Sequence, residues 1–120
     1  MAATKGPRDG KSLVIRLYKE GFANPDPRTL NRFFAPNYKD HSFFGDLKGM
    51  KAALQTLRTA HPNLEWRLEH VVAEGDKVAV RASLLLKNAG GIKRAVTSTS
   101  IYRIAQGKIV EHWGNGDTLL

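Results

Sequence analysis

The chain has no cysteine among its 120 residues, which excludes disulfide bonds, thiolate metal sites and a cysteine nucleophile. It also lacks an apolar run near the ~20 residues that a membrane-spanning helix needs, and its start, MAATKGPRDGKS, has no apolar secretion-signal core. A glycine-rich phosphate loop, a Gly-x-Ser-x-Gly elbow and a helical His-x-x-x-His pair are all missing. We therefore expect a cytoplasmic protein with no metal site, limited to acid-base chemistry by Asp, Glu, His and Tyr.

The formal net charge of +8 favours anionic partners, and by charge alone nucleic acid is the strongest candidate. The basic residues are nevertheless spread along the chain, and Lys93-Arg94 is the only adjacent basic pair. Dispersed charge of this kind is typical of a solvated surface. We expect neither nucleic-acid nor membrane binding.

Hydrophobic periodicity predicts an α+β fold in a single domain spanning residues 1–120, with residues 1–8 as a disordered tail. Helices are expected over 9–22, from Pro27 to Pro36, and over 47–60. The second half alternates with period two, which predicts strands over 64–72, 78–86, 92–104 and 109–113 joined by tight turns. Helices packed on one side of this four-stranded antiparallel meander would leave a concave apolar cavity, the usual place for a small ligand.

Several strand residues are candidates for lining that cavity, and each has an ordinary structural alternative. Arg81, which shares a face with Ser83, needs an acceptor such as Asp117 if it points inward, and is a solvated surface residue otherwise. Ser98 and its neighbour Ser100 offer hydrogen-bonding groups or are simply strand residues. The tryptophans, Trp66 and Trp113, are core residues or flat walls for a ligand.

The extended segment YKDHS and the C-terminal stretch WGNGD carry the other candidates. Tyr38 and His41 follow a helix, where functional groups often lie on loops, although a lone histidine there is usually surface. His70 and His112 are predicted to be ordinary sheet residues. The two glycines around Asn115 let the chain bend and direct Asp117 into the cavity.

Three stretches, NYKDHSFFGDLKGMKAAL, HPNLEWRLEHVVAEGDKVAVR and IYRIAQGKIVEHWGNGD, resemble in order the SnoaL-like polyketide cyclases of the nuclear transport factor 2-like superfamily. The resemblance implies a cone-shaped barrel in which a curved, mainly antiparallel sheet wraps around N-terminal helices. It also implies a homodimer, and ring closure by an intramolecular aldol reaction without a cofactor. Asp117 matches the acid-base carboxylate of those cyclases, and Tyr38 and His41 match their tyrosine and histidine.

Two related enzymes of the superfamily resemble the chain in part. Limonene epoxide hydrolase is similar through Arg81 and Asp117, but Ser83 stands where it has a second aspartate. Ketosteroid isomerase is similar through a tyrosine matched by Tyr18, while its catalytic aspartate falls near His41-Ser42.

The sequence therefore predicts a cofactor-independent cyclase or isomerase acting on a small hydrophobic carbonyl or polyketide-like substrate. The alternatives are an epoxide-opening hydrolase or cyclase, and a non-catalytic module for ligand binding or dimerisation. The expected catalytic residues are Asp117 and His41. The expected substrate-binding residues are Tyr38, Arg81, Ser83, Trp66, Ser98, Trp113 and Asn115.

Overall fold

The computed structural model describes residues 7–24, 26–42, 44–88 and 90–116. Helix α1 spans Pro7–Arg16 and continues as a π-helical turn, η1, over Leu17–Gly21; α2 spans Pro27–Leu30 and α3 spans Leu47–Ala60. The strands are β1 Phe34–Asp40, β2 Gly45–Asp46, β3 Glu65–Glu74, β4 Lys77–Asn88, β5 Gly91–Ala105 and β6 Lys108–Gly116. They form one sheet in the order β2-β1-β6-β5-β4-β3, so the predicted meander is present as β3 to β6.

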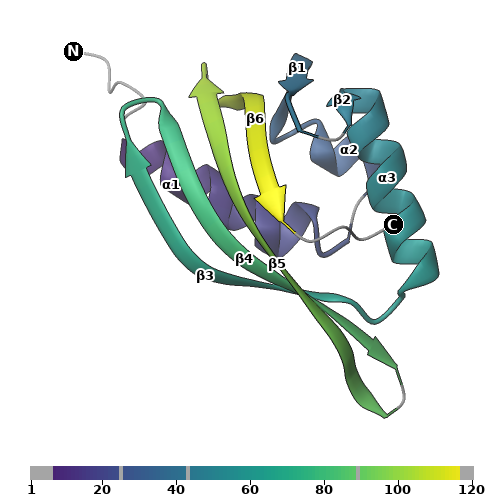
Figure 1. The fold of residues 1–120 in the computed structure, drawn as a ribbon. Coiled ribbons are helices and arrows are strands. Elements are labelled where there is room, and N and C mark those ends of the chain that lie inside the picture. The colour runs from purple at the N-terminus through teal and green to yellow at the C-terminus, as the bar shows by residue number, and fades with distance from the viewer. Residues whose placement is uncertain (1–6, 25, 43, 89, 117–120) are drawn as a thin grey trace.

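The sheet is bent, and the helices lie inside the bend (Figure 1). The long strands β3, β4 and β5 curve past α1, and α3 lies on the far side of the concave space. Leu13, Val14 and Leu17 pack in one cluster with Val78 and Val80 of β4, so this side of the sheet carries the core. The predicted α+β fold, with a curved sheet around N-terminal helices, is confirmed. None of the helices in the described part of the chain has the length and apolarity needed to cross a membrane.

Two N-terminal predictions need correction. The first helix begins at Pro7 rather than Asp9, because proline suits the first helical turn, whose N–H groups have no intrahelical partner. The second helix ends at Leu30 rather than Pro36, and β1 begins at Phe34. Pro36 disfavours helical geometry at the preceding residue, and β1 pairs in parallel with β6, a contact 70 residues away that local periodicity cannot reveal. The sheet is therefore mixed, and mostly antiparallel.

The end of the first helix widens into η1, where the amide of Phe22 donates to the carbonyl of Leu17 over 2.8 Å. A Cβ atom at Gly21 would lie 3.0 Å from Leu17 and 3.4 Å from Leu30, so glycine lets this turn pack closely against α2. Such π-helical turns are often found at functional sites. Here the turn carries Tyr18, whose side chain is buried.

Helix α3 is fixed at its start by Asp46, whose carboxylate accepts a hydrogen bond from the amide of Gly49 at 2.9 Å. This N-cap satisfies one of the free amides of the first turn. Met50, Leu54 and Leu57 recur at helical spacing and form its buried face. The helix thereby presents an apolar face to the concave side of the sheet.

Candidate active site

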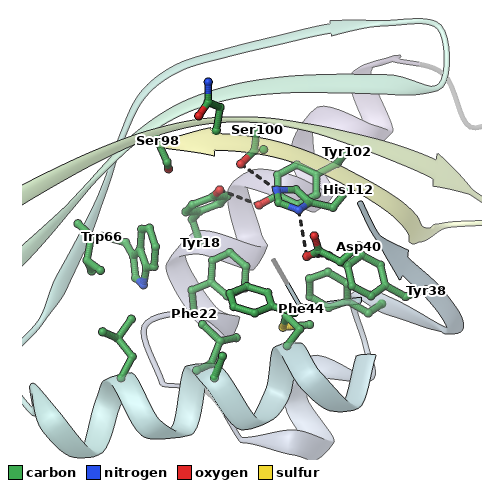
Figure 2. A pocket seen from close by; sticks show the side chains of 18 of the residues that line it. Tyr18, Phe22, Tyr38, Asp40, Phe44, Trp66, Ser98, Ser100, Tyr102 and His112 are labelled. Carbon is green, nitrogen blue, oxygen red and sulfur yellow. Dashed lines mark hydrogen bonds and ion pairs between the residues drawn. The ribbon is translucent and has the colours of Figure 1, made fainter. Parts of the chain in front are cut away.

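A cavity of about 210 Å³ lies between the concave face of the sheet and α3. Its walls are mainly aromatic and aliphatic, with contributions from Phe22, Phe34, Phe44, Leu54, Leu84 and Val96. Figure 2 shows Asp40, Tyr38 and His112 at one end and Trp66 at the other, with Tyr18 and Phe22 between them. An apolar cavity with a few convergent polar groups is the usual form of a small-molecule site.

The polar end is built by strand register. In the parallel pair, the Cα of Asp40 on β1 is opposite that of His112 on β6, and in the antiparallel pair Tyr102 on β5 is opposite His112 from the other side. Directly paired residues on one face of a sheet have neighbouring side chains. Tyr38 precedes Asp40 by two residues, so alternation places both on the same face.

A hydrogen-bonded chain connects these groups. The Asp40 carboxylate accepts from the Tyr38 hydroxyl at 2.8 Å, from the Ser42 amide at 2.8 Å and from Nδ1 of His112 at 3.1 Å. On the far side of the ring, Nε2 of His112 lies 2.9 Å from the Ser100 hydroxyl. The Asp40 side chain is fully buried and that of His112 is 10% exposed. Because an ionised carboxylate can only accept, Nδ1 carries a proton and Nε2 is left to exchange one with Ser100.

Asp40 is held in its ionised form. Burial alone would raise its pKa, but hydrogen bonds from His112, the Ser42 amide and Tyr38 outweigh burial and lower the pKa from 3.8 to about 2. A buried carboxylate beside an imidazole fixes the orientation and the tautomer of the ring. The pair therefore suits proton transfer at His112.

The tyrosines beside this pair stay neutral. The Tyr18 and Tyr102 hydroxyls lie 2.7 Å apart, and both side chains are buried. Burial raises the pKa of Tyr18 to about 12 and that of Tyr102 well above 10.0. One hydroxyl donates to the other, so one O–H group of the two is left as a hydrogen-bond donor, the type of group that stabilises a developing oxyanion.

Of the predicted substrate-binding residues, Tyr38, Trp66, Ser98 and Asn115 line this cavity, although Asn115 is largely exposed at its edge. Arg81 and Ser83 lie on the other face of the sheet, which corrects their expected position. Val80 and Ala82 of the same strand face the core, so alternation directs Arg81 and Ser83 to the opposite face. There Nε of Arg81 lies 3.4 Å from Oε1 of Glu69, and the Ser83 hydroxyl hydrogen-bonds the same carboxylate.

His41 and Trp113 also lie outside the cavity, against expectation. They stack on each other with ring centroids 5.0 Å apart, and His41 hydrogen-bonds Glu111 at 2.8 Å. His41 directly follows Asp40, which faces the cavity, so alternation directs it outward. For Trp113 the reason is a β-bulge: Ile104 pairs with Ile109 but Arg103 pairs with Glu111, so Val110 is an extra residue in β6. The bulge shifts the alternation by one and turns His112 inward and Trp113 outward.

Asp117, the other predicted catalytic residue, lies outside the described residues. The last described residue, Gly116, pairs with Ser98 of the cavity wall.

Sequence reasoning missed Asp40, His112 and Tyr102, although it named Ser100 beside Ser98 as a candidate for the cavity. If residues 34–40 had been predicted as a strand, alternation would have placed Asp40 on the same face as Tyr38. His41 would then have been on the opposite face. No signal in the sequence reveals the bulge at Val110. Among the described residues, His, Asp and Glu side chains form no group of three that could hold a metal ion.

Solved structures share this fold at low sequence identity. A loop-truncation variant of IdmH, a candidate polyketide cyclase from Streptomyces antibioticus, matches with a TM-score of 0.80 at 24% identity, over 90% of this chain and 92% of that one. A candidate SnoaL-like polyketide cyclase from Jannaschia sp. CCS1 matches with a TM-score of 0.77 at 22% identity, over 98% and 91%. An NTF2-like protein of unknown function from Mesorhizobium loti matches with a TM-score of 0.72 at 17% identity, over 98% of each chain. At these identities the likeness shows the fold.

No curated protein matches the sequence significantly. Residues 14–112, which include every polar side chain of the cavity described above except Asn115, match the SnoaL-like domain family. The chain therefore belongs to the SnoaL-like domain family.

Proposed function

We propose that the protein is a cofactor-independent enzyme that cyclises or isomerises a small hydrophobic carbonyl compound by acid-base catalysis. The observation that carries this proposal is the buried Asp40–His112 pair, which faces an apolar cavity next to neutral tyrosine hydroxyls. The structural likeness to candidate polyketide cyclases supports the same reaction class.

The reaction would begin with proton removal from a carbon next to the substrate carbonyl. His112, directly or through Ser100, accepts the proton, and Asp40 stabilises the imidazolium that results. The carbonyl oxygen becomes an enolate oxygen and accepts a hydrogen bond from the Tyr18 or Tyr102 hydroxyl.

Two outcomes follow from the enolate. For an aldol ring closure, its carbon attacks a second carbonyl carbon of the same substrate, and the new alkoxide takes the proton back from His112. For an isomerisation, the proton returns to a different carbon.

Asp117 stays a prediction as a second acid-base residue. Its neighbour Gly116 pairs with Ser98, which lines the cavity, and this supports a role near the substrate. The homodimer expected from the resemblance is likewise a proposal.

An exchange assay tests the proposal without knowledge of the natural substrate. β-Tetralone, a bicyclic ketone, is incubated in heavy water with the protein, and NMR measures deuterium incorporation at the carbon next to the carbonyl above the background rate. Wild type is expected to accelerate exchange, and Asp40→Asn to lose most of that acceleration.

The same assay separates the two candidate carboxylates. If Asp117→Asn loses the acceleration of deuterium exchange and Asp40→Asn keeps it, the acid-base role belongs to Asp117. No acceleration by wild type at all would favour the non-catalytic binding module.

A further inference from the structure

The end of the cavity opposite the Asp40–His112 pair contains an unpaired hydrogen-bond donor. The ring nitrogen of Trp66, Nε1, is buried and has no hydrogen-bond partner among the described residues. Figure 2 shows Trp66 at this end, with the nitrogen edge of its ring directed across the cavity towards α3. Buried tryptophan N–H groups usually have an acceptor, and one left without costs free energy.

The rings and aliphatic side chains around Trp66 supply no hydrogen-bond acceptor for this N–H group. Its ring packs edge-on to Tyr18, with centroids 5.6 Å apart, and against Phe22 at 5.5 Å. It also packs against the main core and against an aliphatic cluster of Leu57, Leu64, Leu84, Leu86 and Val96.

The polar groups beside Trp66 along β3 are engaged elsewhere. Glu65 and Arg67, on either side of Trp66 along β3, bond to each other at 2.9 Å, and Glu65 also pairs with Lys87. Alternation directs both to the opposite face of the sheet. The Tyr18 hydroxyl bonds to Tyr102.

We propose that Trp66 Nε1–H binds an oxygen atom of the ligand, so that the substrate carries two hydrogen-bond acceptors. This rests on the proposed function: one carbonyl lies among His112 and the tyrosine hydroxyls, and a second carbonyl or ether oxygen lies at Trp66. The body between them is an apolar ring system held by Phe22 and α3. A single N–H in an otherwise apolar end would fix which end of such a molecule reaches the acid-base pair.

The tryptophan on the other face provides a matched control. Trp113 stacks on His41 outside the cavity, and the chain has no other tryptophan. Trp113→Phe therefore makes the same chemical change as Trp66→Phe without touching the cavity.

Two bicyclic probes test the proposal by binding rather than turnover. One is a methyl-substituted octalindione with one ketone on each ring, and the other is the octalone with a methylene in place of the second ketone. The full-length protein is ¹⁵N-labelled, its indole N–H signals are assigned with the two Phe variants, and both probes are titrated. We expect the dione to shift the Trp66 signal and leave the Trp113 signal in place.

The affinities give a second readout. The dione should bind about tenfold more tightly than the octalone to wild type and to Trp113→Phe, the advantage expected from one neutral hydrogen bond. In Trp66→Phe the advantage should fall below about twofold.

Three results would overturn the proposal: an unmoved Trp66 signal when the dione binds, an advantage that persists in Trp66→Phe, or no binding of either probe. Failure of the proposed function looks different. In that case the Trp66 signal shifts but wild type does not accelerate deuterium exchange.

Discussion

The two faces of the sheet carry the same pair of residue types and use them differently. At the end of β1, the neighbours Asp40 and His41 lie beside Glu111 and His112 of β6, and each histidine pairs with a carboxylate of the other segment. Asp40–His112 is buried and faces the cavity, whereas His41–Glu111 lies on the outer face, where the His41 side chain is 35% exposed. Burial and access to the cavity, rather than residue type, distinguish a candidate catalytic pair from a surface ion pair.

Exposure to solvent weakens the electrostatic interaction within such a pair. Hydrogen bonds from His41 and then Arg103 lower the pKa of Glu111, but water and salt screen this outer pair. On the concave face the Asp40 carboxylate is buried, so its hydrogen-bond partners determine its charge. The comparison leads to four predictions.

The largest difference is expected for activity when each histidine is changed in the same way. His112→Gln should lower the catalysed deuterium exchange of β-tetralone by about hundredfold or more, the usual contribution of a general base. His41→Gln should change it by less than about twofold, because that ring does not line the cavity. Equal losses in both variants would contradict the distinction between the faces.

Gly114 offers a steric way to disturb only the inner pair. A Cβ atom there would lie 2.7 Å from Cε1 and 2.8 Å from Nε2 of His112, so the imidazole must move. We expect Gly114→Ala to lower exchange activity about tenfold or more and to destabilise the fold by about 1–3 kcal/mol. Kinetics and urea unfolding measure the two effects, and unchanged kinetics would show that the ring position is unimportant.

Asp40 should also contribute to stability in a pH-dependent way. Its pKa is lower in the folded protein, about 2 against 3.8, so the stabilisation is present above about pH 4 and is lost as the pH falls towards 2. Asp40→Asn should remove about 2 kcal/mol at neutral pH and flatten the acid dependence below pH 4.

Urea unfolding at several pH values measures this contribution, and Glu111→Gln is the matched control. Glu111→Gln should lower the free energy of unfolding much less than Asp40→Asn, because its pair with His41 is exposed to solvent. A larger loss in Glu111→Gln than in Asp40→Asn would reverse the assignment of the two pairs.

The smallest effect concerns the tyrosines, all of which are buried. Because burial raises the pKa of Tyr18 to about 12, its contribution to stability is present below pH 10 and is lost as the pH rises towards 12. In an ultraviolet titration, tyrosinate should therefore form in the folded protein only above about pH 11, whereas the denatured chain titrates near pH 10. Tyrosinate formed near pH 10 without unfolding would mean that a tyrosine is exposed to water.

The sequence was sufficient for the parts of the fold that depend on local pattern. Helix α3 was predicted with its observed bounds, because the apolar spacing of Met50, Leu54 and Leu57 and the terminal histidine-proline sequence are local signals. The strands of the meander followed from alternation and turn residues in the same way.

The site was less predictable because its polar end depends on contacts between distant strands. Tyr38, Trp66, Ser98 and Asn115 were found, but Trp113 was expected in the cavity and His112 was interpreted as an ordinary sheet residue. One bulged residue, Val110, reverses the alternation of β6, and it leaves no mark on the hydrophobic pattern. Asp40 was missed because its position in the site depends on the pairing of β1 with β6, some 70 residues later.

The central claim, that Asp40 and His112 form a buried pair facing the ligand, can be tested directly by NMR of the histidine rings. We predict a slowly exchanging Nδ1–H signal that is absent in His112→Gln, lost or strongly shifted in Asp40→Asn, retained in His41→Gln, and shifted when β-tetralone binds. A His112 ring proton that exchanges with water as fast as that of His41, and that does not respond to the ketone, would contradict the account.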